Sequence, residues 1–399
     1  MKKILLSAYQ CDPTHGSESA NGYNWAAGLR REGYRVTCIT RMYTSDEGKK
    51  KIEENHGDDK DFRIVYVQTP LRLQNTKLTY LKYIVWQWAA YRKAKELHLK
   101  EKFDLVHHVV WGNFYLGSFM YKLKIPFIFG PVGGGQVAPV AFKRYFGKKW
   151  YMEIVRDVIA KTLIKFNPAA YNTIKYANNL IASNLETKEK ILKYGGSKCA
   201  LEFDVKLPQS FFPIELSEKG SSKELKLLWV GRLLPRKGVL LVIEAMAQLK
   251  EYSDITLTIV GDGEMRKYLE DDIKKYNLKN VKLIGRIPYE KVSEEYSNHD
   301  VFFFTSLRDS NGMQVLEAMA FGLPVVTLQL HGQDLLVNEA VGIKASVNNP
   351  EQTVIELANA ILLLHNDRKL LGRMSKAAFN FAKVHTWEKQ VKLFVEKYY

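Results

Sequence analysis

The sequence predicts an α/β fold with two doubly wound parallel-sheet domains. Short apolar runs alternate with longer helical segments along two separate stretches of the chain, and a polar segment with prolines and glycines lies between them. Strands that alternate with helices form parallel sheets covered by helices on both faces. The chain has 399 residues, of which 46% are hydrophobic and 26% charged, so it is long enough for two globular domains.

The first series of elements occupies the N-terminal half. Short apolar runs bounded by polar residues or glycine predict strands, and longer mixed segments predict helices. The strands are expected at 3–7, 35–40, 64–68, 105–108, 127–129 and 180–183, and the helices at 17–31, 77–100 and 113–121.

The second series begins near residue 225. Its strands are expected at 226–230, 255–260, 281–284, 300–304 and 324–327, with helices at 239–249 and 264–276 among those between them. The segment 208–224 contains two prolines and the polar run SEKGSSKE, which is typical of an interdomain linker. We therefore expect a first domain over 1–207, a linker over 208–224 and a second domain over 225–386.

Composition restricts the partners and the compartment. The chain carries 59 Lys and Arg against 43 Asp and Glu, and this net charge of +16 favours an anionic partner: nucleic acid, an anionic lipid surface or a phosphorylated substrate. Three cysteines without metal-ligand spacing favour a reducing compartment. The first apolar run is too short for a signal peptide, and no stretch approaches 18 apolar residues, so we expect a cytoplasmic protein without a membrane span.

The most informative segment is 302–326, which predicts a buried strand, a polar loop, a helix and a second short strand. The helix begins near Gly312, where free backbone N–H groups and the helix dipole favour an anion such as phosphate. Asp309 and Glu317 lie eight residues apart around this helix start, and carboxylates accept hydrogen bonds from hydroxyl groups. A phosphate flanked by hydroxyl-rich groups describes a nucleotide sugar.

A second segment, 227–238, supports this interpretation. An apolar strand ends at Gly231, and Arg232 and Lys237 follow in the loop before the next helix. A planar guanidinium combined with a mobile ammonium suits a diphosphate. The alternative is that both side chains are solvated surface cations.

The motifs of these segments resemble the GT-B retaining glycosyltransferases of family 4. The resemblance rests on the runs V-G-R-L-x-P-x-K-G at 230–238 and S-x-x-D-x-x-G-x-x-x-L-E-A-M-A-x-G-x-P-V-V at 306–326. It implies a nucleotide-sugar-binding second domain facing an acceptor-binding first domain across a cleft. It also implies that a final helix over 387–399 packs back on the first domain; an ordinary last helix of the second domain is the alternative. Asp309 stands where the family usually has Glu.

The resemblance also implies roles for individual residues. Arg232 and Lys237 would stabilise the departing diphosphate, Asp309 would hold hydroxyls of the donor sugar, and these three form the expected catalytic set. Glu317 would bind the ribose. The sugar or distal phosphate would meet the backbone at Asn311, Gly312 and Met313, and the base would lie beside Gly285, Arg286 and Ile287. No metal cofactor is expected, since cations already neutralise the diphosphate; the D-x-D spacing at 59–61 is most simply a solvated turn.

The first domain is expected to contribute glycine-rich loops to the site. Gly16 precedes a helix in the run PTHGSE, which is similar to a subset of the family that often builds bacterial surface polysaccharides; a simple helix cap is the alternative. Gly133 and Gln136 belong to the loop GPVGGGQ at 130–136, whose glycines suit close ligand approach. Many relatives have a histidine after this strand, where this chain has glycine and proline. His107 is expected in the core, whereas His108 could reach the cleft.

Two basic segments with aromatic residues, 77–102 and 142–166, have the composition of interfacial helices. They suggest peripheral binding to an anionic membrane, with solvated helix faces as the alternative. The leading prediction is transfer of a sugar from a nucleotide-diphosphate donor to a hydroxyl of a glycan or lipid-linked saccharide in polysaccharide biosynthesis, with a UDP-sugar as the favoured donor and a GDP-sugar as the second candidate. The alternatives are a catalytically silent nucleotide-sugar-binding protein and a basic nucleic-acid-binding protein, although no nucleic-acid-binding motif is present.

Overall fold

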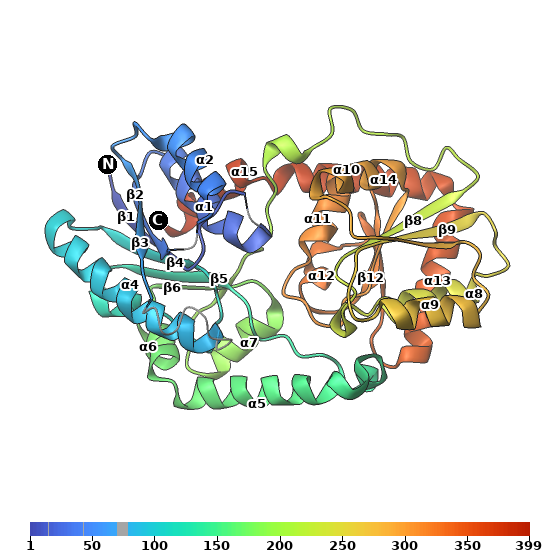
Figure 1. Ribbon diagram of the computed structural model, residues 1–399, viewed down its shortest axis with the longest axis horizontal. Helices are drawn as coiled ribbons and strands as arrows, with labels where there is room; N and C mark the ends of the chain where they lie inside the picture. The colour runs from blue at the N-terminus through green and yellow to red at the C-terminus, as the bar shows by residue number, and fades with distance from the viewer. Residues whose placement is uncertain (15, 43, 70–78) are drawn as a thin grey trace. The chain divides into compact units, whose positions relative to one another are not determined.

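The computed structural model of the protein describes residues 1–14, 16–42, 44–69 and 79–399. The chain forms two compact units, each built around a parallel sheet (Figure 1). Unit 1 comprises Met1–Gly135, Val158–Asp204 and Trp387–Tyr399, and unit 2 comprises Gln136–Asp157 and Val205–Thr386. Residues 136–157, which the sequence analysis assigned to the first domain, therefore cluster with unit 2, as do the expected linker residues 208–224.

The described residues of unit 1 form a seven-stranded parallel sheet in the order β3-β2-β1-β4-β5-β6-β7. Its strands are β1 Lys3–Ala8, β2 Arg35–Arg41, β3 Phe62–Val67, β4 Leu105–Val110, β5 Phe127–Val132, β6 Asn179–Ala182 and β7 Ala200–Leu201. Its helices are α1 Gly16–Arg31, α2 Asp46–His56, α4 Thr79–Glu101, η1 Phe119–Leu123, α6 Pro168–Tyr176, α7 Leu185–Lys193 and α15 Trp387–Tyr398. Helix α5, Trp150–Phe166, contains the division between the units.

Alternation along β1 explains why helices cover both faces of this sheet. Successive side chains of a strand point to opposite faces. Ile4 and Leu6 accordingly belong to the buried cluster that includes residues of α1 and α15, whereas Leu5 belongs to the cluster that includes residues of α4. The last helix, α15, packs against α1, where the rings of Trp25 and Phe394 lie 4.7 Å apart in an edge-to-face arrangement (Figure 1).

In unit 2, six parallel strands of the described chain form a sheet in the order β10-β9-β8-β11-β12-β13. The strands are β8 Leu225–Val230, β9 Ile255–Val260, β10 Val281–Gly285, β11 Val301–Phe304, β12 Val325–Leu328 and β13 Gly342–Ala345. The helices are η2 Val140–Lys149, η3 Gln209–Phe211, η4 Pro235–Lys237, α8 Val239–Gln248, α9 Arg266–Lys275, α10 Tyr289–Asn298, α11 Met313–Ala320, α12 His331–Leu336, α13 Pro350–Asn366 and α14 Arg368–Val384.

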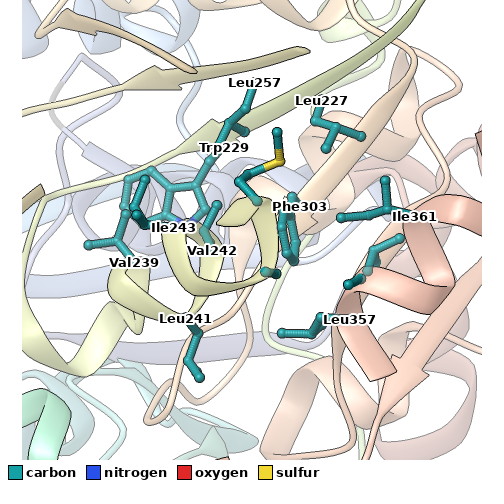
Figure 2. Packing of buried hydrophobic residues seen from close by; sticks show 14 of the residues in the cluster. Leu227, Trp229, Val239, Leu241, Val242, Ile243, Leu257, Phe303, Leu357 and Ile361 are labelled. Carbon is teal, nitrogen blue, oxygen red and sulfur yellow. The ribbon is translucent and has the colours of Figure 1, made fainter. Parts of the chain in front are cut away.

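The core of unit 2 fixes the strand ends that carry the site. Figure 2 shows apolar side chains of α8 and α13 packing against those of β8, β9 and β11. Trp229, Val242 and Phe303 are at most 1% exposed in this cluster. On the opposite face, Tyr296 of α10 packs against Phe302, with ring centroids 5.9 Å apart. Burial on both faces explains why the strand segments of this unit are almost entirely apolar.

The predicted fold class is confirmed, and the errors are local. The helix expected at 113–121 is wrong over most of its length: only η1, at Phe119–Leu123, is helical there, and Gly117 has a positive φ of 65° that a regular helix excludes. The short strands β7 and β13 and the helix α2 were not predicted. The predicted start of the second helix, at residues 77 and 78, lies outside the described residues.

Candidate active site

The turn η4 and the loop after β11 are joined by hydrogen bonds within unit 2. The Leu307 amide donates to the carbonyl of Arg236 over 2.8 Å, and the Thr305 hydroxyl donates to the carbonyl of Gly238 over 3.0 Å. Gly238 has a φ of 63°, and a Cβ atom there would lie 2.1 Å from the carbonyl oxygen of Thr305. Only glycine fits this position, which brings two segments about 70 residues apart into one site.

Asp309 lies at the centre of the joined segments. Its Oδ1 accepts a hydrogen bond from Arg236 over 2.9 Å, its Oδ2 forms an ion pair with Lys237, and the Ser306 hydroxyl donates to Oδ2 over 3.1 Å. Its side chain is 19% exposed, whereas that of Lys237 is only 7% exposed. Lys237 also lies over the ring of Phe304, 5.3 Å from its centroid. The carboxylate is thus enclosed by cations and a hydroxyl.

Electrostatics favour the ionised form of Asp309. Burial acts to raise the pKa of this carboxyl group, but the charges of Lys237 and Arg236 and the hydrogen bonds from Lys237 and Ser306 outweigh it and hold the pKa below its ordinary value. Burial lowers the pKa of Lys237; Asp309 opposes this shift, and the nearby charges of Arg236 and Arg232 reinforce it. The site therefore concentrates positive charge from the η4 segment beside one carboxylate.

Arg308, the residue before Asp309, is held by a different partner. Its guanidinium donates a hydrogen bond to Oε1 of Glu153 on α5 over 3.0 Å and forms an ion pair with Oε2 of the same carboxylate at 2.6 Å. Its carbonyl accepts a hydrogen bond from Arg236 over 3.2 Å. Burial and the neighbouring Arg156 lower the pKa of Arg308, and Glu153 opposes this shift. Arg308 thus anchors the loop to α5 and leaves Asp309 to the cations of η4.

The two predicted cations, Lys237 and Arg232, have different surroundings, and a third cation, Arg236, lies beside Asp309. Lys237 is buried and paired with Asp309, so it is not a solvated surface cation. Arg232 is exposed, and its charge acts on Lys237. Arg236, which the sequence reasoning missed, contacts Asp309 directly. Its position beside Lys237 in a single turn after Pro235 was the available indication.

Glu317, in α11, is buried and held by two tyrosines of α10. The Tyr289 hydroxyl donates to its Oε1 over 2.8 Å, and the Tyr296 hydroxyl donates to its Oε2 over 3.0 Å. Burial raises the pKa of Glu317, although these two hydrogen bonds act in the opposite direction. Neither tyrosine was predicted; the α10 sequence YEKVSEEY places them seven residues apart, on one face of a helix.

The start of α11 is closely packed by its surroundings. The N-cap of this helix is Gly312, which has no side chain of its own to cap it. A Cβ atom at Gly332 would lie 1.7 Å from the carbonyl oxygen of Ser310 and 2.2 Å from Oδ1 of Asn311. Asn311 and Met313 are both partly exposed. The predicted backbone positions thus lie in one well-supported turn between Asp309 and Glu317.

The expected base-binding residues follow β10. Gly285 has a φ of 77°, and its carbonyl accepts a hydrogen bond from Gly261 over 2.8 Å. Arg286 is exposed and Ile287 is partly exposed. Tyr289 follows two residues later and contacts Glu317, so this strand end is connected to α11 through that side chain.

The remaining predicted site residues belong to other segments of the chain. Gly16 begins α1, and Gly133 pairs with Asn113 in an isolated parallel bridge; both belong to unit 1. Gln136 belongs to unit 2, where its carbonyl accepts a hydrogen bond from Arg156 over 2.9 Å. Two of the four glycines in the loop at 130–136, Gly130 and Gly134, have positive φ.

Both histidines of β4 lie in the core of unit 1. His107 lies 2.6 Å from the Tyr399 hydroxyl through Nδ1 and 2.6 Å from the Gly130 carbonyl through Nε2. His108 contacts the hydroxyls of Ser7 and Tyr83, each over 3.0 Å. Burial, with a smaller effect of His107, lowers the pKa of His108 to about 3. His108 is fully buried and hydrogen-bonded inside unit 1.

The acidic pair of the D-x-D run is occupied by arginines. Asp59 accepts from Arg30 over 2.6 Å, and Asp61 accepts from Arg35 over 2.6 Å. Within the residues that the structure describes, no group of three or more His, Cys, Asp and Glu side chains is placed to hold a metal ion. In the same part of the chain, no helix has both the length and the apolar character needed to cross a membrane.

The chain is similar to known glycosyltransferases. Residues 214–381 match the family Glycosyl transferases group 1. An uncharacterized glycosyltransferase of Methanocaldococcus jannaschii, MJ1607, is 25% identical over 343 residues, which cover 82% of this chain and 80% of that protein. A GDP-mannose-dependent alpha-mannosyltransferase of Corynebacterium glutamicum is 32% identical over 161 residues, 40% of this chain and only 36% of that protein.

Solved structures show the same fold over the whole chain. The structure of Anabaena Alr3699/HepE in complex with UDP has a TM-score of 0.67 at 18% identity. The likeness covers 99% of this chain and 100% of that chain. Together with the two parallel sheets, this likeness identifies the fold as GT-B. Residues 214–381 therefore resemble the Glycosyl transferases group 1 family, and the comparisons together support a glycosyltransferase.

Proposed function

We propose that the protein transfers a sugar from a nucleoside-diphosphate donor to a hydroxyl group of a glycan or lipid-linked saccharide, with retention at the anomeric carbon. The observation that carries this proposal is the pairing of Asp309 with cations of η4 at one end of the β11–α11 segment, while Glu317 lies at the other. A UDP-sugar is the favoured donor, in line with the UDP complex of HepE; a GDP-sugar is the second candidate, in line with the GDP-mannose-dependent relative.

Each charged group has one proposed role in this reaction. Lys237 and Arg232 stabilise the negative charge that grows on the departing diphosphate. Asp309 binds hydroxyls of the donor sugar, and Arg236 holds Asp309 in place. Glu317 binds the ribose, and residues 285–287 lie beside the base. Since cations of the chain neutralise the diphosphate, we propose that no metal ion is needed.

The proposed transfer uses the donor phosphate as its base. The bond between the anomeric carbon and the phosphate oxygen breaks, and a bond from that carbon to the acceptor oxygen forms on the same face. The acceptor proton passes to the departing phosphate oxygen, so no protein nucleophile is required. Gly16 and Gly133 are the proposed contacts of unit 1 with the substrates, and Gln136 of unit 2 is a further proposed contact.

A screen of nucleotide sugars by thermal shift tests the donor, because a ligand that binds the folded state raises the melting temperature. With the donor found, Lys237→Ala and Arg232→Ala should each raise the barrier to transfer by about 2–4 kcal/mol. Lys282→Ala, at an exposed position on β10, is the matched control and should keep full activity. Full activity in either of the first two variants would refute the diphosphate assignment, and binding without transfer would indicate a catalytically silent protein.

We also propose peripheral binding to an anionic membrane, supported by a strip of aromatic and basic residues in unit 1. Trp88 of α4 is 48% exposed and Tyr176 of α6 is 53% exposed. Lys122 lies over the rings of Trp88 and Tyr121, and Tyr121 stacks on Tyr176. Lys175 in turn lies over the ring of Tyr176. Trp and Tyr beside Lys suit the interface between lipid headgroups and acyl chains.

Vesicle binding tests this second proposal. Adsorption contributes about 1 kcal/mol per cation at an anionic surface and is screened by salt. The double variant Lys122→Glu and Lys175→Glu should bind phosphatidylserine vesicles more weakly than the wild type does. A second variant, with glutamate at four positions of the second basic segment, should also bind them more weakly; these positions are Lys148, Lys149, Lys161 and Lys165. Lys282→Glu is the control in unit 2. If the wild-type protein does not bind such vesicles at low salt, the membrane proposal is refuted and a soluble acceptor is favoured.

A further inference from the structure

Glu317 has two hydrogen-bond partners that differ in accessibility. Tyr296 is fully buried, and its ring packs between Phe302 and Phe321 with centroids 5.9 and 5.7 Å away. Tyr289 is 60% exposed and is the first residue of α10. Its hydroxyl nevertheless reaches Oε1 of the buried carboxylate over 2.8 Å. One oxygen of Glu317 is therefore held from inside the core and the other by a side chain at the surface.

We propose that the Tyr289 hydroxyl occupies the place of a ligand hydroxyl on Glu317, so that a nucleotide binds by displacing it. Tyr289 is in this sense a positioning residue that competes with the ribose. The inference rests on the proposed function, in which Glu317 binds the ribose hydroxyls. It goes beyond that function by naming which bond is exchanged and which one stays.

Burial decides which tyrosine can leave. A buried carboxylate that loses a partner without a replacement carries the full cost of desolvation. If Tyr296 left Oε2, its hydroxyl would remain in an apolar pocket without a partner. Tyr289 can instead rotate into solvent, where water satisfies its hydroxyl, while the incoming ligand hydroxyl satisfies Oε1. The exchange therefore leaves no buried polar group unsatisfied.

The position of Tyr289 in the chain is consistent with such a rotation. Its ring contacts Phe211 of η3 at the long centroid distance of 6.3 Å and with a tilt of 31°. It begins α10 directly after Pro288, so its side chain can change rotamer without breaking hydrogen bonds inside the helix. In the absence of donor, the tyrosine keeps Glu317 hydrogen-bonded and oriented toward the site.

The test compares ligands with and without ribose hydroxyls on three proteins. UDP, or GDP if the donor screen selects guanosine, and the matching 2′,3′-dideoxynucleoside diphosphate are titrated by calorimetry into the wild type, Tyr289→Phe and Tyr296→Phe. Tyr289→Phe should bind the ribonucleotide about threefold to tenfold more tightly, since no hydrogen bond has to be displaced. It should bind the dideoxy ligand no more tightly than the wild type does. Tyr296→Phe should weaken binding of the ribonucleotide.

The outcomes separate this inference from the proposed function. If the wild type binds the ribonucleotide but Tyr289→Phe leaves the affinity unchanged or lowers it, the exchange is refuted and the donor site stands. If Tyr289→Phe tightens both ligands equally, the tyrosine blocks the site sterically and does not compete with the ribose. If the wild type binds neither nucleotide, the proposed function and this inference fall together.

Discussion

Asp309 and Glu317 belong to one continuous segment, yet their surroundings are opposite. Asp309 is held by Lys237, Arg236 and a hydroxyl group, and its pKa is lowered. Glu317 is held by two phenol hydroxyls in a buried position, and its pKa is raised. The first carboxylate is stabilised by charge, and the second is satisfied only by neutral donors among these contacts.

This difference indicates what each end of the segment can accept. A ligand that brings negative charge, such as a diphosphate, is attracted by the cations around Asp309. At Glu317, neutral hydroxyl donors already bind, so a ligand hydroxyl can replace one of them at little net cost. A matching pair of acids in the sequence therefore does not mean matching chemistry, because the neighbours decide the role of each.

Removal of Lys237 should have the largest effect on the ion pairs around Asp309. Without Lys237, the partly buried Asp309 carboxylate keeps only Arg236 and Ser306 as partners, so Lys237→Met should lower the free energy of unfolding by about 1.5–3 kcal/mol, measured by urea denaturation. Arg232→Met is the control from the same loop, and as an exposed residue it should change stability by at most about 0.5 kcal/mol. Equal stability of Lys237→Met and the wild type would show that the pair with Asp309 contributes nothing.

Ligand binding sharpens the contrast between the two acids. Glu317→Gln should weaken the nucleoside diphosphate and the nucleotide sugar alike, because both contain the ribose. Asp309→Asn should weaken the nucleotide sugar selectively. Hydrogen bonds to charged groups contribute about 1.5–3 kcal/mol, so each loss should be about tenfold or more in calorimetric titrations. An equal loss of both ligands in Asp309→Asn would refute the division between sugar and ribose.

The sequence predicted the sheets well because their evidence is local. Apolar runs such as 255–260 coincide with the observed strand β9, and the run from Trp387 coincides with α15. The failures are where the information is not local. The segment at 113–121 was predicted to be helical, but the turn at Gly117 and the bridge at Asn113 hold it in another conformation.

The candidate site shows the same limit. The spacing of the motifs indicated Lys237, Asp309 and Glu317 as site residues. The sequence pattern does not show which other side chains these three contact. Arg236 was missed because only the geometry of the short turn shows that both adjacent cations, Arg236 and Lys237, reach Asp309. Tyr289 and Tyr296 were missed because they lie 28 and 21 residues before Glu317 in the sequence. Burial of Lys237 likewise depends on tertiary packing that the sequence does not display.

The two tyrosine hydroxyls that bind Glu317 are expected to contribute unequally to the free energy of unfolding. Tyr296→Phe leaves a buried carboxylate oxygen without its donor and should lower the free energy of unfolding by about 1–3 kcal/mol. In Tyr289→Phe, the exposed ring can turn away so that water replaces the lost hydroxyl at Oε1, and the cost should be at most about 0.5 kcal/mol. Urea denaturation of both variants measures the difference. A larger cost for Tyr289→Phe would mean that this tyrosine is a fixed structural partner.

The smallest expected effect is the opposite pH dependence of the two acids. The folded-state pKa of Asp309 lies below its ordinary value of 3.8, so the stabilisation it provides is complete above pH 3.8 and is lost as the pH falls through the lowered pKa. The folded-state pKa of Glu317 lies above its ordinary value of 4.5, so ionised Glu317 costs stability at neutral pH. That cost is relieved as the pH falls through the raised pKa toward 4.5.

Each variant removes one of these contributions, and thermal unfolding from neutral pH to the lowest pH at which the wild type folds measures both. On acidification below 3.8, the melting temperature of Asp309→Asn should approach that of the wild type, because only the wild type loses the charged contribution. The melting temperature of Glu317→Gln should fall relative to the wild type as the pH approaches 4.5, because only the wild type gains from protonation. Parallel curves for both variants would mean that the two carboxylates share one electrostatic environment, and the contrast between the charged and the neutral end would be lost.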